Sequence, residues 1–582
     1  MNMPEAADNF TAREPEPTGA FEPTEISADV GCAGRALRLR ELIVPFAVLA
    51  VLYGCTLTRN LSAAHDSIAY INSIDTGVGL YHQHHLLYNP LGSVWVKGLR
   101  AVGMTADSAL LVAALNGIFG ALSMCVFYAL LRARLKLGVV QSLIGTALPA
   151  FSYGVWFYSV CIEVYIIPLF FLLLTLYVVS GGSATARTFA LAGATHGLAV
   201  LFHQVHVMFA VVIAAAALLH YRRNIAGAVR ACVVYAAVAV PLVVLPYAAV
   251  MIFSARIQTP AGALRWLTAY AHEGQFWHSL SLGTLLKALV GTSKTLVGGQ
   301  FVFALPWARE FLRRMLAGNS LSDEIFLVRN ISVILAAGLT VLAVIFGVGF
   351  AAGLTAALAR IRRLPARARL LLVLIAVWLA PYCVFFFFWE PMNVEMWIPQ
   401  SVCAWLILMM AFAGRAGASR PATVLLAVLA AAGLATNYLG SIRPMADLRN
   451  DWYYARVAGL RGAREGDLAV VPREWVWKKY VERYSAAEPL MLLDLREDAG
   501  SDDDFMQAAA ERIDAALAAG AGVYVLGEAV DPPADMLGGS RLTPEILSEF
   551  WDNYRDRWRP AAPGANAYVL TAQQGTETSG QQ

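Results

Sequence analysis

The stretch HDSIAYINSIDTGVGLYHQHHLLYNP, residues 65–90, holds the densest group of polar and aromatic side chains in a mostly apolar chain. It follows the first apolar run and contains Asp66, Asp75 and histidines at 82, 84 and 85. A segment next to a membrane that is this rich in titratable groups is where chemistry is expected. We therefore predict that residues 65–90 form a functional loop and that the apolar runs beside it build the fold.

The composition is that of a polytopic membrane protein. Of 582 residues, 58% are hydrophobic and 15% are charged, and the mean hydropathy is +0.57; soluble domains carry about 25% charged residues. The net charge of +3 does not indicate nucleic-acid binding, because the basic residues stand in short clusters between apolar runs. The seven cysteines include no CxxC pair, so neither a disulfide framework nor a thiolate metal site is indicated.

A membrane helix needs about 20 apolar residues, and the chain offers about eleven such segments. They lie near 42–58, 107–131, 138–157, 162–180, 187–202, 204–221, 228–253, 330–358, 370–388, 397–413 and 422–438. Residues 187–221 are taken as two spans, because a single span would move the arginine-rich segment 359–369 to the outside. The protein is thus predicted in the inner (plasma) membrane with a cytoplasmic N-terminus, and residues 65–90 and the C-terminal region face the periplasm.

The predicted domains are a disordered tail at 1–40, a transmembrane domain at 41–439, an outer soluble α/β domain at 440–572 and a tail at 573–582. The transmembrane domain includes an outer loop at 59–106 and an outer interfacial segment at 254–328, with amphipathic helices over 263–280 and 285–303. In the α/β domain, LAVV at 468, LMLLDL at 490, GVYVL at 522 and AYVL at 567 predict strands, and 503–519 and 543–557 predict helices.

Asp66 is either an ordinary acid at headgroup level or, with the histidines beside it, a group that moves protons. His82, His84 and His85 can carry protons, donate to phosphate or hydroxyl groups, or bind a metal, so a divalent metal is one alternative. On an extended segment His82 and His84 share a face and His85 points away, which disfavours one metal bound by all three.

Other candidates follow further along. Glu163, near the outer start of the fourth span and beside Tyr165, is a functional acid or the partner of a structural cation. His203 and His206 are spaced to share one helical face. The chain has no Walker loop, GxGxxG after a strand, HExxH or GxSxG motif, so a nucleotide-driven pump or serine hydrolase has no support.

The order of HDSIAY, HHLLYNPLG, WFYSVCIEVY and GLAVLFHQVH along the first 220 residues resembles the GT-C superfamily of membrane glycosyltransferases, in particular the branch of protein O-mannosyltransferases and bacterial lipid-sugar-dependent enzymes. The resemblance implies transfer of a sugar from a polyprenyl-phosphate lipid to a glycan, lipid or protein acceptor. It makes Asp66 the general base and Glu163 a second catalytic acid. The substrate-binding candidates are His82, His84, His85, Tyr88, Tyr165, His203, His206, Lys97 and Arg265. Unlike many relatives, the chain has no second acid directly beside Asp66.

Two other functions fit the same sequence. A transporter or flippase would use the acids and histidines as a proton relay, although they cluster at one face and no internal repeat is evident. A catalytically inactive relative would assemble cell-envelope complexes through residues 440–572.

Overall fold

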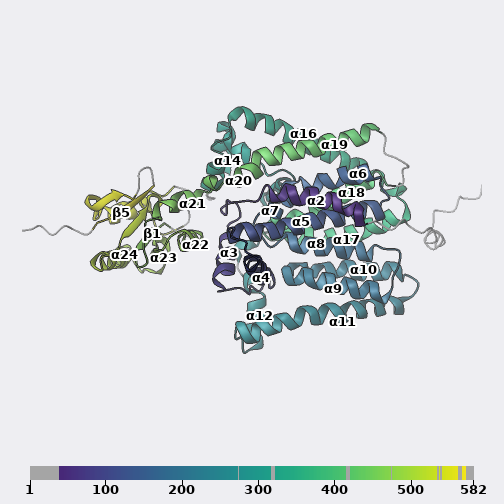
Figure 1. Ribbon diagram of the computed structural model, residues 1–582, viewed down its shortest axis with the longest axis horizontal. Coiled ribbons are helices and arrows are strands. Elements are labelled where there is room, and N and C mark those ends of the chain that lie inside the picture. The colour runs from purple at the N-terminus through teal and green to yellow at the C-terminus, as the bar shows by residue number, and fades with distance from the viewer. Residues whose placement is uncertain are drawn as a thin grey trace, which may run out of the picture. The chain divides into compact units, whose positions relative to one another are not determined.

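The computed structural model describes residues 39–571 except 273, 316–320, 414–419, 473–474, 534–535, 538–539 and 562–565 (Figure 1). Residues 37–582 form one compact unit. The tails predicted at 1–40 and 573–582 lie outside the described residues, except for the last two residues of the first.

Five helices of the described residues are long and apolar enough to cross a membrane. They are α5 (Ser108–Ala133), α11 (Ile225–Ala249) with its extension η3 (Val250–Ser254), α16 (Val333–Leu358), α17 (Ala366–Phe388) and α19 (Arg420–Asn437) with η9 (Tyr438–Ile442) and α20 (Arg443–Met445). The remaining six predicted spans also fall on helices: α2 (Leu39–Gly54), α6 (Val139–Ala150), α8 (Ile166–Val179), α9 (Ala186–Phe202), α10 (Ala210–His220) and α18 (Ile398–Met410). The number of helices that cross the membrane stays a prediction.

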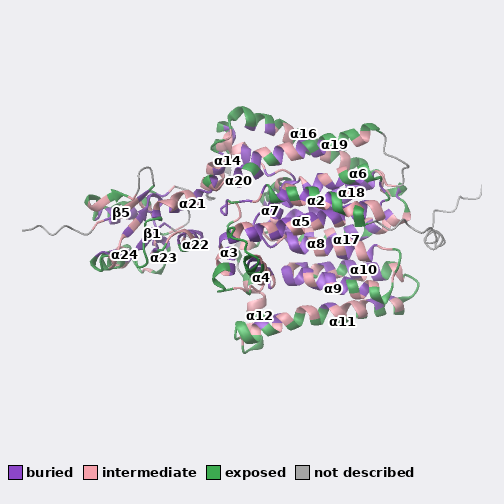
Figure 2. Cartoon of the chain, viewed as in Figure 1, coloured by how far each residue is buried: buried purple, intermediate pink, exposed green. Residues whose placement is uncertain are grey.

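Burial separates the helices in the centre of the bundle from those at its rim (Figure 2). The central α5 is 67% buried over its apolar window, whereas α11 and α16 are 17% buried. The outward side chains of α16 include Ile334, Val344 and Val348, and all three are exposed. A helix that is apolar on its exposed face fits a lipid environment, where its backbone hydrogen bonds are made internally.

Residues 187–221 form two helices, as predicted. Helix α9 ends at Phe202, His203 has extended backbone angles, and the 3₁₀ turn η2 (Gln204–Phe209) leads into α10. The chain reverses its direction at this turn. The reversal places His220, at the end of α10, 3.0 Å from the carbonyl oxygen of Val179, at the end of α8. That end of the bundle also holds the ion pair between Arg132 and Glu41, with an N–O distance of 3.2 Å. Asp66 and the histidines lie at the opposite end.

Most of residues 65–90 is not a loop, and that prediction was wrong. Residues Asp66–Thr76 form helix α3, and Tyr88–Ala101 form α4. Helix α3 ends at Gly77, whose φ of 76° is a left-handed conformation that suits glycine, and its N–H donates to Ser73 O. Asp66 therefore stands in the first turn of a helix, where the helix dipole favours a negative charge.

The outer interfacial segment is helical in shorter pieces than predicted. It contains α12 (Pro260–Leu267), α13 (Leu282–Leu296), α14 (Pro306–Met315) and α15 (Ser322–Leu327), with 3₁₀ turns η4 (Ala269–His272), η5 (Gly274–Phe276) and η6 (Gln300–Ala304). The helix predicted over 263–280 ends early, because the hydroxyl of Thr268 turns back to donate to Leu264 O. The helix predicted over 285–303 ends near Gly299, which has a φ of 80°.

The C-terminal part is an α/β domain, as predicted. Its sheet has the order β2-β1-β3-β5-β4, with β1 (Leu468–Val471) parallel to β2 (Glu488–Met491) and β3 (Val523–Leu526), and β5 (Ala567–Leu570) antiparallel to β3 and β4 (Trp558–Pro560). The helices are α21 (Trp452–Val457), α22 (Trp475–Tyr484), α23 (Leu492–Asp498), α24 (Asp502–Ala518), α25 (Gly527–Val530) and α26 (Pro544–Asp552). Two predictions need correction: LMLLDL becomes helical from Leu492, and the last helix ends at Asp552. The edge strand β4 was not predicted.

Candidate active site

Asp66 stands in the first turn of α3 and is exposed to solvent. The hydroxyl of Tyr70, one turn along α3, donates to Asp66 Oδ2 over 3.3 Å. The surrounding protein desolvates the carboxyl and raises its pKa, and this outweighs the opposing effects of the Tyr70 hydrogen bond and of the adjacent His65. Asp66 is thus reachable from solvent and more basic than an ordinary aspartate.

The charge of Asp66 raises the pKa of three further carboxyl groups. Glu163 is 4% exposed, in the turn between α7 (Tyr153–Val160) and α8, and burial, then Asp66 and Glu395, raise its pKa well above the usual range. Burial, then Glu395 and Asp66, raise the pKa of Glu390 to about 7. Glu395 accepts a 2.5 Å hydrogen bond from the hydroxyl of Tyr158. We call these four groups the outer acid cluster. Burial and the neighbouring like charges thus both favour the protonated form of Glu163.

The three histidines of HQHH lie together, so the expectation that His85 points away was wrong. The segment folds into turns, and the His82 and His85 rings stack with centroids 4.3 Å apart, while His82 and His84 are 5.4 Å apart. Burial lowers the pKa of His82 and His84 to about 4 and that of His85 well below its usual range. They are neutral at pH 7, and therefore act as hydrogen-bond donors or acceptors and not as cations.

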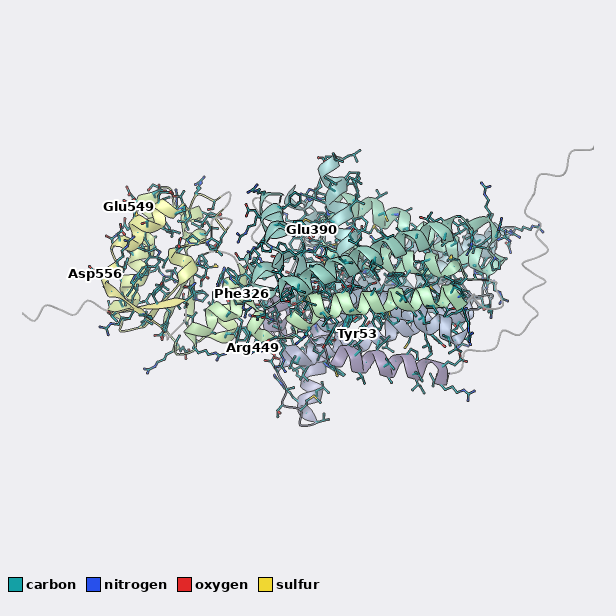
Figure 3. All side chains as sticks on the ribbon, turned by 90° about the horizontal axis from the view of Figure 1, so that it is seen from above. Tyr53, Phe326, Glu390, Arg449, Glu549 and Asp556 are labelled. Atoms are coloured by element: carbon teal, nitrogen blue, oxygen red, sulfur yellow. The ribbon has the colours of Figure 1, made fainter. Side chains whose placement is uncertain are left out.

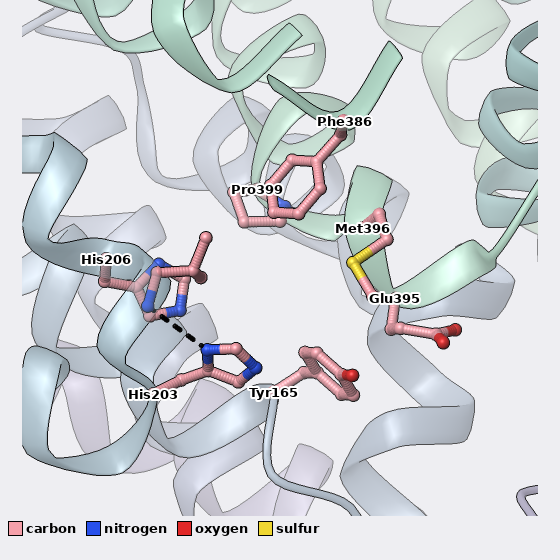
Figure 4. Close-up of a pocket in the computed structure, with 8 residues that line it drawn as sticks. Tyr165, His203, His206, Phe386, Glu395, Met396 and Pro399 are labelled. Atoms are coloured by element: carbon pink, nitrogen blue, oxygen red, sulfur yellow. Dashed lines mark hydrogen bonds between the residues drawn. The ribbon is translucent and has the colours of Figure 1, made fainter. Parts of the chain in front are cut away.

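A recess opens between the turn at His203 and the start of α18 (Figure 4). It is lined by Tyr165, His203, Val205, His206, Phe386, Glu395, Met396 and Pro399. His203 and His206 face each other with ring centroids 5.6 Å apart, but the helix break at His203 means that they do not share one α-helical face as predicted. Tyr165 lies 5.3 Å from His203 between the ring centroids.

Some histidine nitrogens of the recess and of the HQHH segment are held by hydrogen bonds, and others have no partner among the described residues. His206 Nδ1 lies 2.9 Å from the hydroxyl of Tyr382, and Val205 N–H donates to His203 Nδ1, the dashed line in Figure 4. Among the described residues, His206 Nε2, His84 Nε2 and His85 Nδ1 are buried without a hydrogen-bond partner. Buried polar atoms normally have partners, so these three nitrogens mark places where a ligand can bind.

Two acids, Asp323 and Glu324, and the nearby cation, Lys294, were not singled out from the sequence. Asp323 and Glu324 lie on the short helix α15, and Asp323 Oδ2 is 3.3 Å from Nε2 of His65. Lys294 on α13 lowers the pKa of Glu324 through its charge, against a larger effect of burial that raises it. The only signal in the sequence was an Asp-Glu pair inside a segment that otherwise looks interfacial.

The other predicted binding residues lie in three different places. Tyr88 is buried, and its hydroxyl accepts a 3.1 Å hydrogen bond from Asn116 Nδ2. Lys97 on α4 and Arg265 on α12 are exposed, and neither lines the recess. The structure therefore brings Asp66, Glu163, Tyr165 and the histidines toward one region but not the two exposed cations.

A divalent metal was one of the sequence-based alternatives. Within the described ranges, no group of three or more His, Cys, Asp or Glu side chains is arranged to hold a metal ion. The acids of the cluster influence one another through charge without converging on one point.

No family model matches the sequence, and no curated protein matches it. Among solved structures, the similarities are weak in both identity and TM-score. One is the Archaeoglobus fulgidus oligosaccharyltransferase in complex with Zn and sulfate, at 14% identity over 87% of this chain and 70% of that chain, with a TM-score of 0.45. The oligosaccharyltransferase AglB from the same organism, with an inhibitory peptide and a dolichol-phosphate, has 12% identity over 92% and 75%, and a TM-score of 0.42.

ArnT from Cupriavidus metallidurans, bound to undecaprenyl phosphate, is 14% identical over 92% of this chain and 98% of that chain, with a TM-score of 0.38. With TM-scores below 0.5, these similarities carry no argument about activity. The function is argued from the site.

Proposed function

We propose that this protein is a membrane glycosyltransferase that moves a sugar from a polyprenyl-phosphate-linked donor to an acceptor on the periplasmic face, with Asp66 as general base. The observation that carries the proposal is the contrast within the outer acid cluster. Asp66 is exposed, whereas Glu163 is buried and Glu390 and Glu395 are half-buried. An acceptor hydroxyl from solvent can reach Asp66, and the raised pKa of its carboxyl suits proton abstraction near neutral pH.

The reaction is a displacement at the anomeric carbon of the sugar. The acceptor oxygen forms the new bond to that carbon as its proton passes to Asp66, and the bond from the carbon to the phosphate oxygen breaks. The electron pair of that bond leaves with the phosphate. Attack opposite to the leaving group inverts the configuration of the sugar. Since polyprenyl phosphate is already a good leaving group, the protein has to remove one proton and stabilise negative charge on phosphate.

The remaining groups of the site suit these two tasks. The neutral histidines offer N–H donors, and His84, His85 and His206 each have a buried nitrogen without a partner. Glu163, whose protonated form is favoured by burial, can donate a hydrogen bond to a sugar hydroxyl. Lys294 supplies positive charge near Glu395 and Glu324. We assign no step to Lys97 or Arg265.

The first test compares the lipids that copurify with the detergent-extracted wild type and with Asp66→Asn, by mass spectrometry. Asparagine is nearly isosteric and keeps an oxygen that accepts from Tyr70, but it is uncharged and cannot take up the acceptor's proton. We expect a polyprenyl-phosphate sugar to be retained by the variant and turnover to fall about 100-fold or more. Asp447→Asn is the matched control, because Asp447 pairs with Arg449 at 2.8 Å and lies outside the acid cluster.

Two outcomes would count against the proposal. Unchanged turnover in Asp66→Asn would remove Asp66 from its role as base. If only bulk phospholipid copurifies with both proteins, under conditions that keep lipid-linked sugars intact, the donor class is wrong and a transporter or an assembly protein becomes the better explanation.

A further inference from the structure

The C-terminal domain holds helix α3, which carries Asp66, at both of its ends. Before the helix, the carboxylate of Asp451 accepts hydrogen bonds from the backbone N–H groups of Leu61 and Ser62, at 2.8 and 3.3 Å. Asp451 is completely buried. The hydroxyl of Tyr480 donates to the same carboxylate over 2.7 Å, and Tyr454 N–H donates over 2.9 Å. Four donors from two parts of the chain thus converge on one side chain.

At the other end of α3, one guanidinium group joins three elements. Arg483 on α22 contacts Asp75 of α3 at 2.9 Å and Asp107 at 3.1 Å. Asp107 is also the N-cap of α5, since its carboxylate accepts from Ala109 N–H over 2.7 Å. The Arg483 side chain is only 12% exposed, and its ion pair with Asp75 is more shielded from water than the pair with Asp107, whose carboxylate is 57% exposed. A largely buried guanidinium that binds two carboxylates is held more rigidly than a cation in an exposed surface ion pair.

A third attachment reaches the helix that carries the missed acids. Arg456 on α21 binds Glu528 at 2.7 Å and lies over the ring of Phe326 on α15, 5.1 Å from its centroid. Phe326 and Arg449 are labelled in Figure 3, and Arg329 links their segments by donating to Arg449 O over 2.7 Å. The domain therefore contacts both α3, which carries Asp66, and α15, which carries Asp323, and both of these acids lie near His65.

Helix α3 depends on such contacts for its position. It has 11 residues, and an isolated helix of that length is marginal in water. The hydroxyl of Ser67 donates to Ile162 O over 2.9 Å, so a displaced α3 would also disturb the turn that holds Glu163. Because a displacement of about 1 Å at a reacting group can cost about 100-fold in rate, small movements of α3 matter.

We propose that the C-terminal domain positions α3 for catalysis, with Asp451 and Arg483 as positioning residues that act through residues 61–62 and through Asp75. This inference rests on the proposed function, because it assigns the domain a role in the reaction that Asp66 performs. The alternative is a domain that only stabilises the protein. That role predicts a loss of folded protein, with full turnover in whatever remains folded.

The test measures turnover per folded protein and hydrogen exchange of residues 61–76 in the full-length protein. The variants are Arg483→Gln, Asp75→Asn, the double variant and Asp451→Asn. Arg512→Gln is the matched control, since Arg512 forms a 3.0 Å ion pair with Glu488 within the same domain and is 52% exposed. We expect each single variant to lower kcat about 10-fold with KM for the donor unchanged, because geometry and not binding is altered.

The double variant tells whether Arg483 and Asp75 act as one unit. We expect its kcat to be close to that of either single variant, together with faster exchange in residues 61–76 and no change in Arg512→Gln. Arg483→Lys, which keeps one charged contact, should recover part of the loss. Unchanged exchange, or faster exchange with unchanged kcat per folded molecule, overturns the inference. If the wild type itself transfers no sugar, the proposed function fails first, and the positioning role fails with it.

Discussion

Asn116 offers the sharpest quantitative test of how the site is held together. It is completely buried in α5, and its Nδ2 lies 2.8 Å from Cys161 O, 2.7 Å from Glu163 O and 3.1 Å from the Tyr88 hydroxyl. Its Oδ1 is buried and has no partner among the described residues. One amide thus fixes the turn that carries Glu163 and also contacts a predicted substrate-binding residue.

Asn116→Leu keeps the number of side-chain heavy atoms and removes the amide, although its two methyl groups are bulkier than the group that they replace. Two backbone carbonyls then lose a buried donor, which costs about 2–6 kcal/mol together, while removal of the unpartnered oxygen returns about 1–3 kcal/mol. The net loss of unfolding free energy is therefore about 1–3 kcal/mol. Turnover should also fall, because the turn at Glu163 is no longer fixed.

Equilibrium unfolding of the purified protein in mixed micelles measures this loss. Ser93→Ala is the control: Ser93 is 4% exposed, and its hydroxyl has no partner within the described part of the chain, so its removal should cost no stability and should return up to about 1–3 kcal/mol. If Asn116→Leu is as stable as Ser93→Ala, the three contacts contribute nothing, and the account of how Glu163 is positioned is refuted.

Two further predictions concern pH and packing. A base acts when ionised, so the raised pKa of Asp66 places the acidic limb of the kcat/KM profile at a higher pH than an ordinary aspartate would. Tyr70→Phe should move that limb to still higher pH, because the lost hydrogen bond from Tyr70 favours the carboxylate. A limb that does not move contradicts this prediction. Gly120→Val should destabilise the protein by about 1–3 kcal/mol, because a Cβ there would overlap the side chain of Ser159. Gly98→Val, where nothing lies within 4 Å, should leave the thermal unfolding temperature almost unchanged, and equal effects of the two substitutions would contradict the packing argument.

The sequence by itself determined the helices of the bundle, the reversal at His203 and the α/β character of the C-terminal domain. These depend on local properties, namely the length of apolar runs and the periodicity of burial. It also identified Asp66 and Glu163, because an acid at the edge of an apolar segment is conspicuous in the sequence.

Only the tertiary structure decided which acids lie close enough to affect each other's pKa. Glu390 and Glu395 lie more than 300 residues from Asp66 in the chain, and no local pattern relates them. The stacking of His82 on His85 needed a turn where an extended segment was expected. The ion pair between Arg483 and Asp75 joins residues that are 408 positions apart in the sequence. The pKa of each group follows from burial and from neighbouring charges, which exist only once the chain has folded, and for that reason the sequence names candidate groups but not their protonation states.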